Sequence, residues 1–322
     1  MKKYNAAVYL LSGRVNLLEK CLSNFFKNWN NKYQYPVFVH YFGNIYSKNF
    51  IKKIRKNVSP LIQFRKVKTK LPRNLKEKDL FYNKKNLRYV REAFSKKRLD
   101  YLHGERFWVN LTSYGKTGCL CKVLKKYDYL MRIDDDSGFL KKINYDLFDK
   151  LKKYPFATGY TWNTYNYTHK DTRVELWNFY KNYLKKFKYT PKNKILKKAV
   201  KENDEYKMHK LPWSAGNINL YNIKLFLKHP WKEYLKHLNK VSGDYQYRWG
   251  DIETIGLFAY THFSKPIYDH NLKQKGLYTN KIESHYSTMV PSTYLKFNLH
   301  NSKVLSFYHW IKHILRRMKL IR

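Results

Sequence analysis

The chain has 322 residues, of which 43% are hydrophobic and 18% aromatic, and its 66 Lys and Arg against 23 Asp and Glu give a formal net charge of +43. This apolar content excludes an intrinsically disordered chain, and the three cysteines are too few for a disulfide framework. No apolar run reaches the ~18 residues of a membrane span and no signal peptide is apparent, so we expect a location in the cytoplasm or on the cytoplasmic face of a membrane.

The first half of the chain alternates between strand and helix patterns. Residues 6–11 form an apolar strand pattern that ends in a turn at Ser12-Gly13-Arg14, and apolar residues recur at helical spacing over residues 16–29. Further strands are predicted at residues 35–42, 61–67 and 127–133, and helices at residues 48–56, 76–102 and 110–126. The alternation predicts an α/β fold with a central, mainly parallel sheet flanked by helices.

The second half of the chain does not continue the strand–helix alternation, and no linker separates it from the first half. An aromatic-rich segment at residues 156–162 precedes a helical region up to residue 201 and an irregular segment at residues 210–219. We predict a single domain over residues 1–303, made of halves 1–150 and 151–303. Residues 304–322 read as a basic amphipathic helix that could lie on an anionic membrane, although packing back on the domain is the commoner outcome.

Three consecutive carboxylates, Asp134-Asp135-Asp136, follow the apolar strand at residues 127–133. On an extended backbone Asp134 and Asp136 point to the same side. That spacing suits a hard divalent metal with oxygen ligands, which commonly carries substrate phosphates. The alternative is a solvated Asp-rich turn. In a parallel sheet the turn at residues 12–14 and the aspartates would lie at the same edge, where ligands bind.

A second cluster, at residues 245–253, combines three large aromatic residues with Arg248, Gly250 and two acids. Such a turn can orient a carboxylate and offer ring faces to a sugar. The alternative is a helix start, with Asp251 as the N-cap of an amphipathic helix over residues 252–263. The two interpretations are compatible.

Four blocks of the sequence, in order, resemble the α-1,2-mannosyltransferases of glycosyltransferase family 15. Residues 6–11 and 31–39 are similar to that family's first strand and its Phe-Asn-x-x-Tyr-x-Tyr-Pro strand. Residues 127–136 and 143–148 resemble Tyr-x-Tyr-Tyr-Trp-Arg-x-Glu-Pro-Asp and x-Tyr-Asp-x-Phe. Gly216-Asn217-Ile218-Asn219-Leu220 falls where the family has Ser-Asn-Phe-Glu-Ile, and residues 247–251 are close to its Glu-Arg-Trp-Gly-Asp. The chain is identified as a divergent member.

The resemblance implies a GT-A-type nucleotide-sugar transferase fold that uses GDP-mannose and Mn²⁺ and retains the anomeric configuration. Residues 1–150 would then form the nucleotide-sugar-binding half and residues 151–303 the acceptor side, for a glycan or glycoconjugate. Asp134 corresponds to the family's metal-binding Glu, Asp136 to the Asp of the same motif, and Asp251 to an active-site Asp, and we expect Asp134 and Asp136 to bind the metal. A metal-binding His corresponds to His270 or to His285.

The resemblance also assigns Arg248 to the donor site, and Arg14 is placed to reach a diphosphate or, alternatively, to be a surface arginine. Asn219 replaces a family Glu that lies near the reacting sugar. An amide does not readily form a covalent glycosyl intermediate, but its oxygen could face an oxocarbenium-like centre in a front-face reaction with the leaving phosphate as base. The structural alternative is an Asn that bonds backbone in a loop.

Two other classes of function compete with a transferase. The high charge with abundant Tyr and Trp would suit a metal-dependent nucleic-acid enzyme, but no nucleic-acid-binding motif occurs and the basic residues are spread from end to end, as codon bias would also produce. Nucleic acid is therefore an unlikely partner. The replacement at Asn219 leaves open an inactive relative that binds a glycan or a membrane.

Overall fold

The computed structural model describes residues 4–67, 71–87, 103–104, 106, 124, 126–163, 170–214, 216–273 and 275–279. The predicted helix at residues 304–322, His285 and most of the predicted helix at residues 110–126 lie outside these ranges. Among the described residues no helix is long and apolar enough to cross a membrane.

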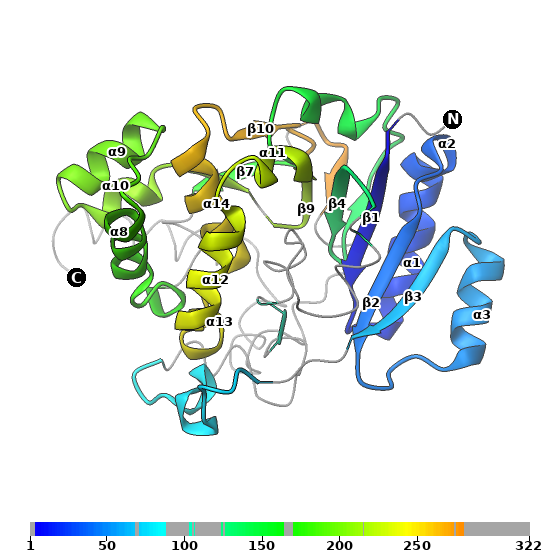
Figure 1. The fold of residues 1–322 in the computed structure, drawn as a ribbon. Coiled ribbons are helices and arrows are strands. Elements are labelled where there is room, and N and C mark those ends of the chain that lie inside the picture. The colour runs from blue at the N-terminus through cyan, green and yellow to red at the C-terminus, as the bar shows by residue number, and fades with distance from the viewer. Residues whose placement is uncertain are drawn as a thin grey trace, which may run out of the picture.

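A seven-stranded sheet in the order β10-β6-β9-β4-β1-β2-β3 runs through the molecule (Figure 1). Its strands are β1 (Ala6–Leu11), β2 (Val37–Phe42), β3 (Ile62–Val67), β4 (Tyr129–Ile133), β6 (Phe156–Thr158), β9 (Ile218–Asn222) and β10 (Ile267–Asp269). All neighbouring strands are parallel except at β9, which runs antiparallel to both β4 and β6. The predicted α/β fold with a mainly parallel sheet is therefore confirmed.

Two small two-stranded sheets lie outside the central one. They pair β5 (Gly138–Phe139) with β11 (Tyr278–Thr279) and β7 (Thr161–Asn163) with β8 (Pro212–Ser214). Both pairs are antiparallel.

Both faces of the central sheet are buried, because the side chains of its strands alternate between two cores. In β1 the residues Ala6, Val8 and Leu10 enter one core, whereas Tyr9 and Leu11 enter the other. The first core is covered by α1 (Val15–Phe25), its π-helical continuation η1 (Phe26–Asn30), α2 (Asn31–Tyr33), α3 (Lys48–Asn57) and the 3-10 helix η4 (Leu147–Lys152). The predicted helix at residues 16–29 is confirmed by α1 and η1.

Helices of the second half pack on the opposite face. The helices of the second half are α8 (Leu176–Phe187), α9 (Lys194–Lys201), α10 (Glu205–His209), α11 (Ile223–Leu227), α12 (Trp231–Val241), α13 (Gly243–Gln246) and α14 (Asp251–His262). Of these, α8, α9 and α10 are seen at the left of Figure 1. Short 3-10 helices η2 (Glu77–Asp79), η3 (Phe81–Asn83) and η5 (Lys170–Thr172) complete the described elements.

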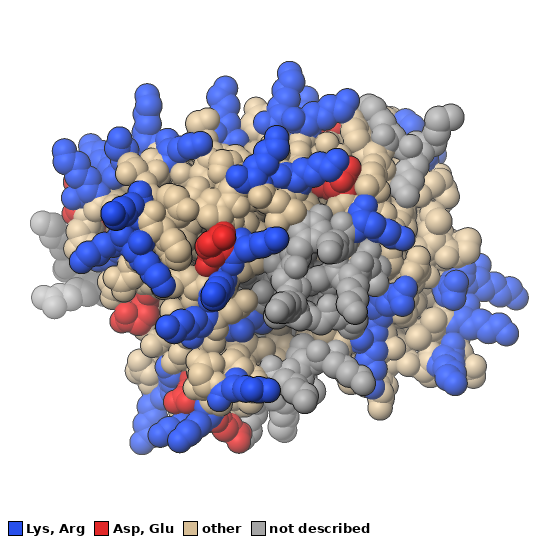
Figure 2. Space-filling view, viewed as in Figure 1, with Lys and Arg blue, Asp and Glu red and all other residues tan. Residues whose placement is uncertain are grey.

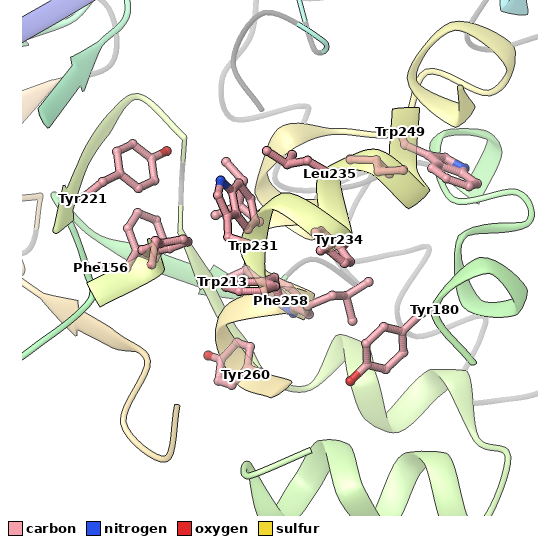
Figure 3. Packing of buried hydrophobic residues seen from close by; sticks show 14 of the residues in the cluster. Phe156, Tyr180, Trp213, Tyr221, Trp231, Tyr234, Leu235, Trp249, Phe258 and Tyr260 are labelled. Atoms are coloured by element: carbon pink, nitrogen blue, oxygen red, sulfur yellow. The ribbon is translucent and has the colours of Figure 1, made fainter. Parts of the chain in front are cut away.

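The core on this face is rich in aromatic rings and surrounds α14 (Figure 3). We call it the aromatic core; its labelled members are Phe156, Tyr180, Trp213, Tyr221, Trp231, Tyr234, Leu235, Trp249, Phe258 and Tyr260. Two glycines are needed for its packing. A Cβ on Gly243 would lie 2.2 Å from the Trp249 ring, and one on Gly256 would lie 2.2 Å from the Trp213 ring.

Two predicted elements are wrong. Of the helix predicted at residues 76–102, residues 76–87 form only the 3-10 helices η2 and η3, and residues 88–102 lie outside the described ranges. The segment predicted to be irregular at residues 210–219 contains β8 and the start of β9. The Asn residues of β9 suggest a loop in the sequence. In the structure their side chains are buried and hydrogen-bonded within the strand.

The basic side chains do not form one stripe. On the face shown in Figure 2, Lys and Arg are scattered over both ends of the molecule. This distribution agrees with the interpretation that the net charge is a property of composition.

Candidate active site at the carboxyl edge of the sheet

The two strands that lead to the candidate residues are neighbours near the middle of the sheet. From β1 the chain moves through β2 to β3 on one side, whereas β4 pairs with β1 on the other side. Open α/β sheets bind ligands where the strand order reverses in this way, outside the carboxyl ends of the strands. Residues 12–14 follow β1 and residues 134–136 follow β4, and hydrogen bonds join the two turns. Their predicted proximity is confirmed.

Asp135, the central aspartate, anchors these turns to each other. Its buried Oδ2 accepts hydrogen bonds from the Ser12 hydroxyl at 2.9 Å and from the backbone N–H groups of Gly13 and Arg14, each at 3.1 Å. Its Oδ1 lies 2.7 Å from Nε and 2.5 Å from Nη2 of Arg14. Donors therefore surround both oxygens, as the burial of a carboxylate requires.

Asp136 shares the same arginine but is less well satisfied. Its Oδ2 lies 2.6 Å from Nη1 of Arg14, while its Oδ1 is buried with no hydrogen-bond partner among the described residues. Burial raises the pKa of the Asp136 carboxyl to about 7, because desolvation outweighs the attraction of Arg14 and the neighbouring aspartates add repulsion. The Arg14 guanidinium, predicted to reach a diphosphate, contacts two carboxylates in this structure.

Asp134 and Asp251 meet at one guanidinium, that of Arg132 in β4. Its Nε and Nη2 donate to Oδ1 of Asp134 at 3.2 and 3.0 Å, and its Nη1 donates to Oδ2 of Asp251. Arg132 is only 6% exposed, so its charge has to be paired inside the protein. Burial alone would lower its pKa, but the two carboxylates raise it further than burial lowers it. Arg132 therefore stays charged and links the end of β4 to the start of α14.

Asp251 is the first residue of α14, as the predicted helix start requires. Its predicted role as N-cap is wrong: the N-cap is Gly250, and no side chain caps this helix. A carboxylate in the first helical turn is still favoured by the helix dipole. Because Arg132 also holds it, Asp251 is a buried, charge-paired carboxylate that lies near Asp134.

Asn217 completes this cluster by donating from Nδ2 to Oδ2 of Asp134 at 3.2 Å. We call the whole set the acidic edge; it consists of Arg14, Arg132, Asp134, Asp135, Asp136, Asn217 and Asp251. The backbone of residues 134–136 forms a turn, closed by a 3.1 Å hydrogen bond from the Ser137 N–H to the Asp134 carbonyl, and not the extended chain assumed for the prediction.

Asn219 lies in β9, opposite Arg132 in β4 and Thr158 in β6. It is 1% exposed. Its side-chain oxygen accepts a hydrogen bond from the Ser214 hydroxyl, and its side chain also bonds the Tyr221 hydroxyl. The oxygen therefore faces Ser214 and is not presented as a free group to a sugar. The predicted catalytic role stays a prediction. The structural alternative, an Asn that bonds backbone in a loop, does not describe Asn219 either, because it lies in a strand and its side chain bonds two hydroxyl groups.

His270 is not brought to the carboxylates. Its ring stacks on Tyr145 and bonds the backbone of Leu147, on the sheet face that α1 and η4 cover, while Asp269 before it bonds Thr161. Burial lowers the pKa of His270 to about 4, and its Nε2 has no hydrogen-bond partner among the described residues. A neutral nitrogen of this kind has the chemistry of a metal ligand, but its position does not support one shared with Asp134.

Arg248 lies in the turn before α14 with a positive φ of 64° and is half-buried. Its predicted contact with the donor stays a prediction.

A divalent cation fits part of the acidic edge. No group of three or more His, Cys, Asp and Glu side chains among the described residues forms a complete metal site. A cation that carries phosphates needs only one or two carboxylates, because phosphate and water oxygens complete its shell. The unpartnered Oδ1 of Asp136 and the 21% exposed side chain of Asp134 are suitable ligands.

Sequence reasoning missed three members of the edge as site residues: Arg132, Asp135 and Asn217. Arg132 did carry a signal, because a charged residue inside an apolar strand needs a buried partner. Asp135 belongs to the predicted run of carboxylates, but the sequence does not show that it bonds Gly13, 122 positions away, or that Asn217 bonds Asp134, 83 positions away.

Comparison with known proteins finds similarity to a family of enzymes. The sequence model of the family described as "Glycolipid 2-alpha-mannosyltransferase" matches residues 1–311. The chain is 26% identical over 139 residues to the glycolipid 2-alpha-mannosyltransferase of Saccharomyces cerevisiae, a match that covers 43% of this chain and 30% of the relative. It is 24% identical over 171 residues to glycolipid 2-alpha-mannosyltransferase 1 of Candida albicans, which covers 53% of this chain and 39% of the relative. The chain thus spans well under half the length of these relatives.

Two solved structures share the fold. The mannosyltransferase Ktr4p from S. cerevisiae superposes with a TM-score of 0.65 at 17% identity, covering 86% of this chain and 70% of that chain. Core-mannan synthase A from Aspergillus fumigatus, in its Mn/GDP form, gives a TM-score of 0.65 at 16% identity and covers 86% of this chain and 74% of that chain. These likenesses confirm the predicted GT-A-type fold.

Proposed function

The chain belongs to the glycolipid 2-alpha-mannosyltransferase family, and from that membership we propose that it is a retaining α-1,2-mannosyltransferase that moves mannose from GDP-mannose to a glycan or glycoconjugate. The observation that carries the proposal is the acidic edge. Its carboxylates lie at the switch point of a fold shared with a structure in an Mn/GDP form.

Asp134 and Asp136 are the residues that would hold Mn²⁺ against the donor diphosphate. When bound, the cation supplies positive charge to the phosphate oxygens as they leave. Arg14 lies beside Asp136 with 19% of its side chain exposed, so it can add its own charge at the same place. The buried Asp135 holds the turn that carries Arg14 in position.

Asp251 would orient the acceptor. Its carboxylate is paired with Arg132 and can accept a hydrogen bond from the acceptor hydroxyl. In the transfer the bond between mannose C1 and the β-phosphate oxygen breaks, and its electron pair stays on the phosphate. The acceptor oxygen forms the new bond to C1, and its proton passes to the leaving phosphate. This front-face route needs no enzyme nucleophile, in agreement with an Asn219 oxygen that is bonded to Ser214.

The test is Mn²⁺-dependent release of GDP from GDP-mannose, run beside GDP-fucose, UDP-glucose and UDP-galactose. We expect release from GDP-mannose alone and its loss in the double variant Asp134→Ala/Asp136→Ala. The matched control is Asp128→Asn, which changes a carboxylate at the amino end of β4 where its partner is the exposed Lys224. It should leave release unchanged.

Two outcomes would contradict the proposal. Binding of GDP without turnover of any donor would favour an inactive glycan-binding relative. Absence of nucleotide binding together with salt-sensitive binding of random oligonucleotides would favour the nucleic-acid alternative.

A further inference from the structure

Tyr46 lies next to the acidic edge, in the core on the sheet face that α1 and α3 cover. It follows the turn after β2 and directly precedes Ser47, the N-cap residue of α3, whose hydroxyl accepts from the Phe50 N–H at 3.1 Å. Tyr46 is 6% exposed. Its ring contacts those of Tyr41, Phe50 and Phe64, at 5.2 to 5.5 Å between centroids. Aromatic packing from β2, α3 and β3 therefore fixes the place of this ring.

Two hydrogen bonds in series connect Tyr46 to Asp135. The Tyr46 hydroxyl oxygen lies 2.5 Å from Oγ of Ser12, a residue that is 1% exposed. Ser12 in turn donates to Oδ2 of Asp135 at 2.9 Å. A serine hydroxyl has one proton, and Ser12 gives it to the carboxylate, so the Tyr46 hydroxyl is the donor to Ser12. Burial raises the pKa of Tyr46 above its ordinary value, which keeps this donor protonated.

The series ends on the carboxylate that orients Arg14. Oδ2 of Asp135 also accepts from the N–H groups of Gly13 and Arg14, and its Oδ1 accepts from Nε of Arg14 at 2.7 Å. Another guanidinium nitrogen, Nη1, lies 2.6 Å from Oδ2 of Asp136. A planar guanidinium that is held at Nε by one carboxylate can reach a second carboxylate with Nη1 only in a fixed orientation. The orientation of Asp135 therefore sets where the charge of Arg14 lies.

Ser12 depends on Tyr46 for its own orientation. Among the described residues no other group donates to Ser12 Oγ, so removal of the Tyr46 hydroxyl would leave a buried oxygen without a donor. The Ser12 hydroxyl would then be free to rotate, and a rotating hydroxyl no longer fixes Oδ2 of Asp135. The turn of residues 12–14 would stay in place but would be held less tightly.

We propose that Tyr46 is a positioning residue for the transfer reaction: through Ser12 and Asp135 its hydroxyl holds the turn of residues 12–14, and with it the charge of Arg14. The inference rests on the proposed function for the role of Arg14 beside the departing phosphate. Tyr46 bonds Ser12 and not a carboxylate of the acidic edge. Since negative charge develops on the phosphate as the bond to mannose breaks, a misplaced Arg14 should lower kcat more than it raises KM.

The experiment compares the full chain with Tyr46→Phe, which keeps the ring and removes only the hydroxyl. It measures kcat and KM for GDP-mannose at saturating Mn²⁺, and deuterium exchange of the peptide that covers residues 12–14 by mass spectrometry. We expect kcat to fall about tenfold and KM to stay within about twofold of the wild type. The amides of Gly13 and Arg14 should exchange about tenfold faster, because Asp135 accepts from both of them.

A second variant and a control separate positioning from a general loss of structure. Ser12→Ala removes the group between Tyr46 and Asp135, so adding Tyr46→Phe to it should lower kcat by no more than about a further twofold. Ser12→Ala alone is measured in the same way if Tyr46→Phe does not fold. The matched control is Tyr35→Phe, which deletes a hydroxyl that donates to the buried Asp146 at 2.6 Å in the same core, before the amino end of β2. It should leave kcat, KM and the exchange of residues 12–14 unchanged.

The exchange measurement needs no substrate, so the inference and the proposed function can fail separately. Exchange of residues 12–14 in Tyr46→Phe within about twofold of the wild type would overturn the inference and leave the proposed function standing. An equal loss of kcat in Tyr35→Phe, or fully additive losses in the Ser12→Ala/Tyr46→Phe double variant, would do the same. Failure of the wild type to release GDP from any donor would overturn the proposed function and, with it, the role of Tyr46 in transfer.

Discussion

The acidic edge and the aromatic core are both buried and both border α14, but they are built on opposite principles. In the aromatic core the rings that make hydrogen bonds have uncharged partners: Tyr234 bonds the Thr254 carbonyl at 2.7 Å, Trp249 the Val174 carbonyl at 2.6 Å and Tyr180 the Thr261 hydroxyl at 2.7 Å. In the acidic edge four carboxylates share two guanidiniums, and Asp136 keeps a buried oxygen without a partner among the described residues. The aromatic core stabilises the fold by packing. The acidic edge retains negative charge that a bound cation would neutralise.

The largest effect is expected when the acidic edge loses Arg132, whose guanidinium Asp134 and Asp251 share. Arg132→Met would leave the carboxylates of Asp134 and Asp251 without that partner, so we expect a loss of about 3 to 5 kcal/mol in the free energy of unfolding and loss of GDP release. Urea unfolding and the release assay would measure it. Lys224→Met, which removes an exposed cation at the other end of β4, is the control. A loss below about 1 kcal/mol for Arg132→Met would show that the pair is not buried as described.

The second prediction is opposite in sign, because Asp136 destabilises the protein in the absence of a cation. Its pKa rises from about 4 in the unfolded chain to about 7 in the folded one. The protonated form therefore stabilises the folded state below pH 4, and this contribution is lost as the pH rises to 7 and above. At pH 8, Asp136→Asn should be more stable than the wild type by roughly 2 to 4 kcal/mol.

The pH dependence provides the check on this second prediction. Thermal unfolding at pH 4, 6 and 8 without divalent cations should show the advantage of the variant growing with pH. Addition of Mn²⁺ at pH 8 should stabilise the wild type and not the variant. A variant that is less stable than the wild type at pH 8 would mean that Asp136 is fully compensated by Arg14.

In the aromatic core a smaller change should affect stability alone. Gly256→Ala places a methyl group against the Trp213 ring, so we expect a loss of about 1 to 3 kcal/mol from overpacking. GDP release per folded molecule should be unchanged, since Gly256 lies within α14 and away from its first turn. Urea titration and an active-fraction assay would measure both quantities. Loss of turnover in the folded fraction would show that core and edge are coupled through α14.

The smallest effect is expected for a surface ion pair. Lys53→Gln breaks the 3.0 Å contact with Glu19. The contact joins α3 to α1, which cover the face of the sheet opposite the aromatic core. Because both side chains are substantially solvated, the free energy of unfolding should change by less than about 0.5 kcal/mol. A larger change would indicate that surface charge contributes to stability in this highly basic chain.

The two regions also differ in how far the sequence predicts them. The alternation of apolar strands and helices predicts β1, α1, β2, α3, β3 and β4, because burial on both faces of a parallel sheet leaves continuous apolar runs. It fails at β9, where Asn219 and Asn222 are buried and bonded to Ser214 and to the Leu151 carbonyl. A buried, satisfied Asn has the same sequence signature as a loop Asn.

For the acidic edge, the sequence predicts which strand ends carry carboxylates but not how they are shared. Asp134 and Asp251 are predicted from the residue pattern and the family resemblance, yet their common partner Arg132 follows only from the antiparallel insertion of β9 and the placement of α14. Likewise, the role of Asp135 depends on backbone N–H groups of the turn after β1, which no side-chain pattern shows.

The most direct test of the central claim, that the acidic edge is the cation and donor site, is Mn²⁺ binding measured by electron paramagnetic resonance in the presence of GDP. The account predicts one bound Mn²⁺ in the wild type and in Asp128→Asn, and none in Asp134→Asn/Asp136→Asn at the same concentrations. Equal binding of Mn²⁺ by the double variant would contradict the account and move the cation site away from this edge.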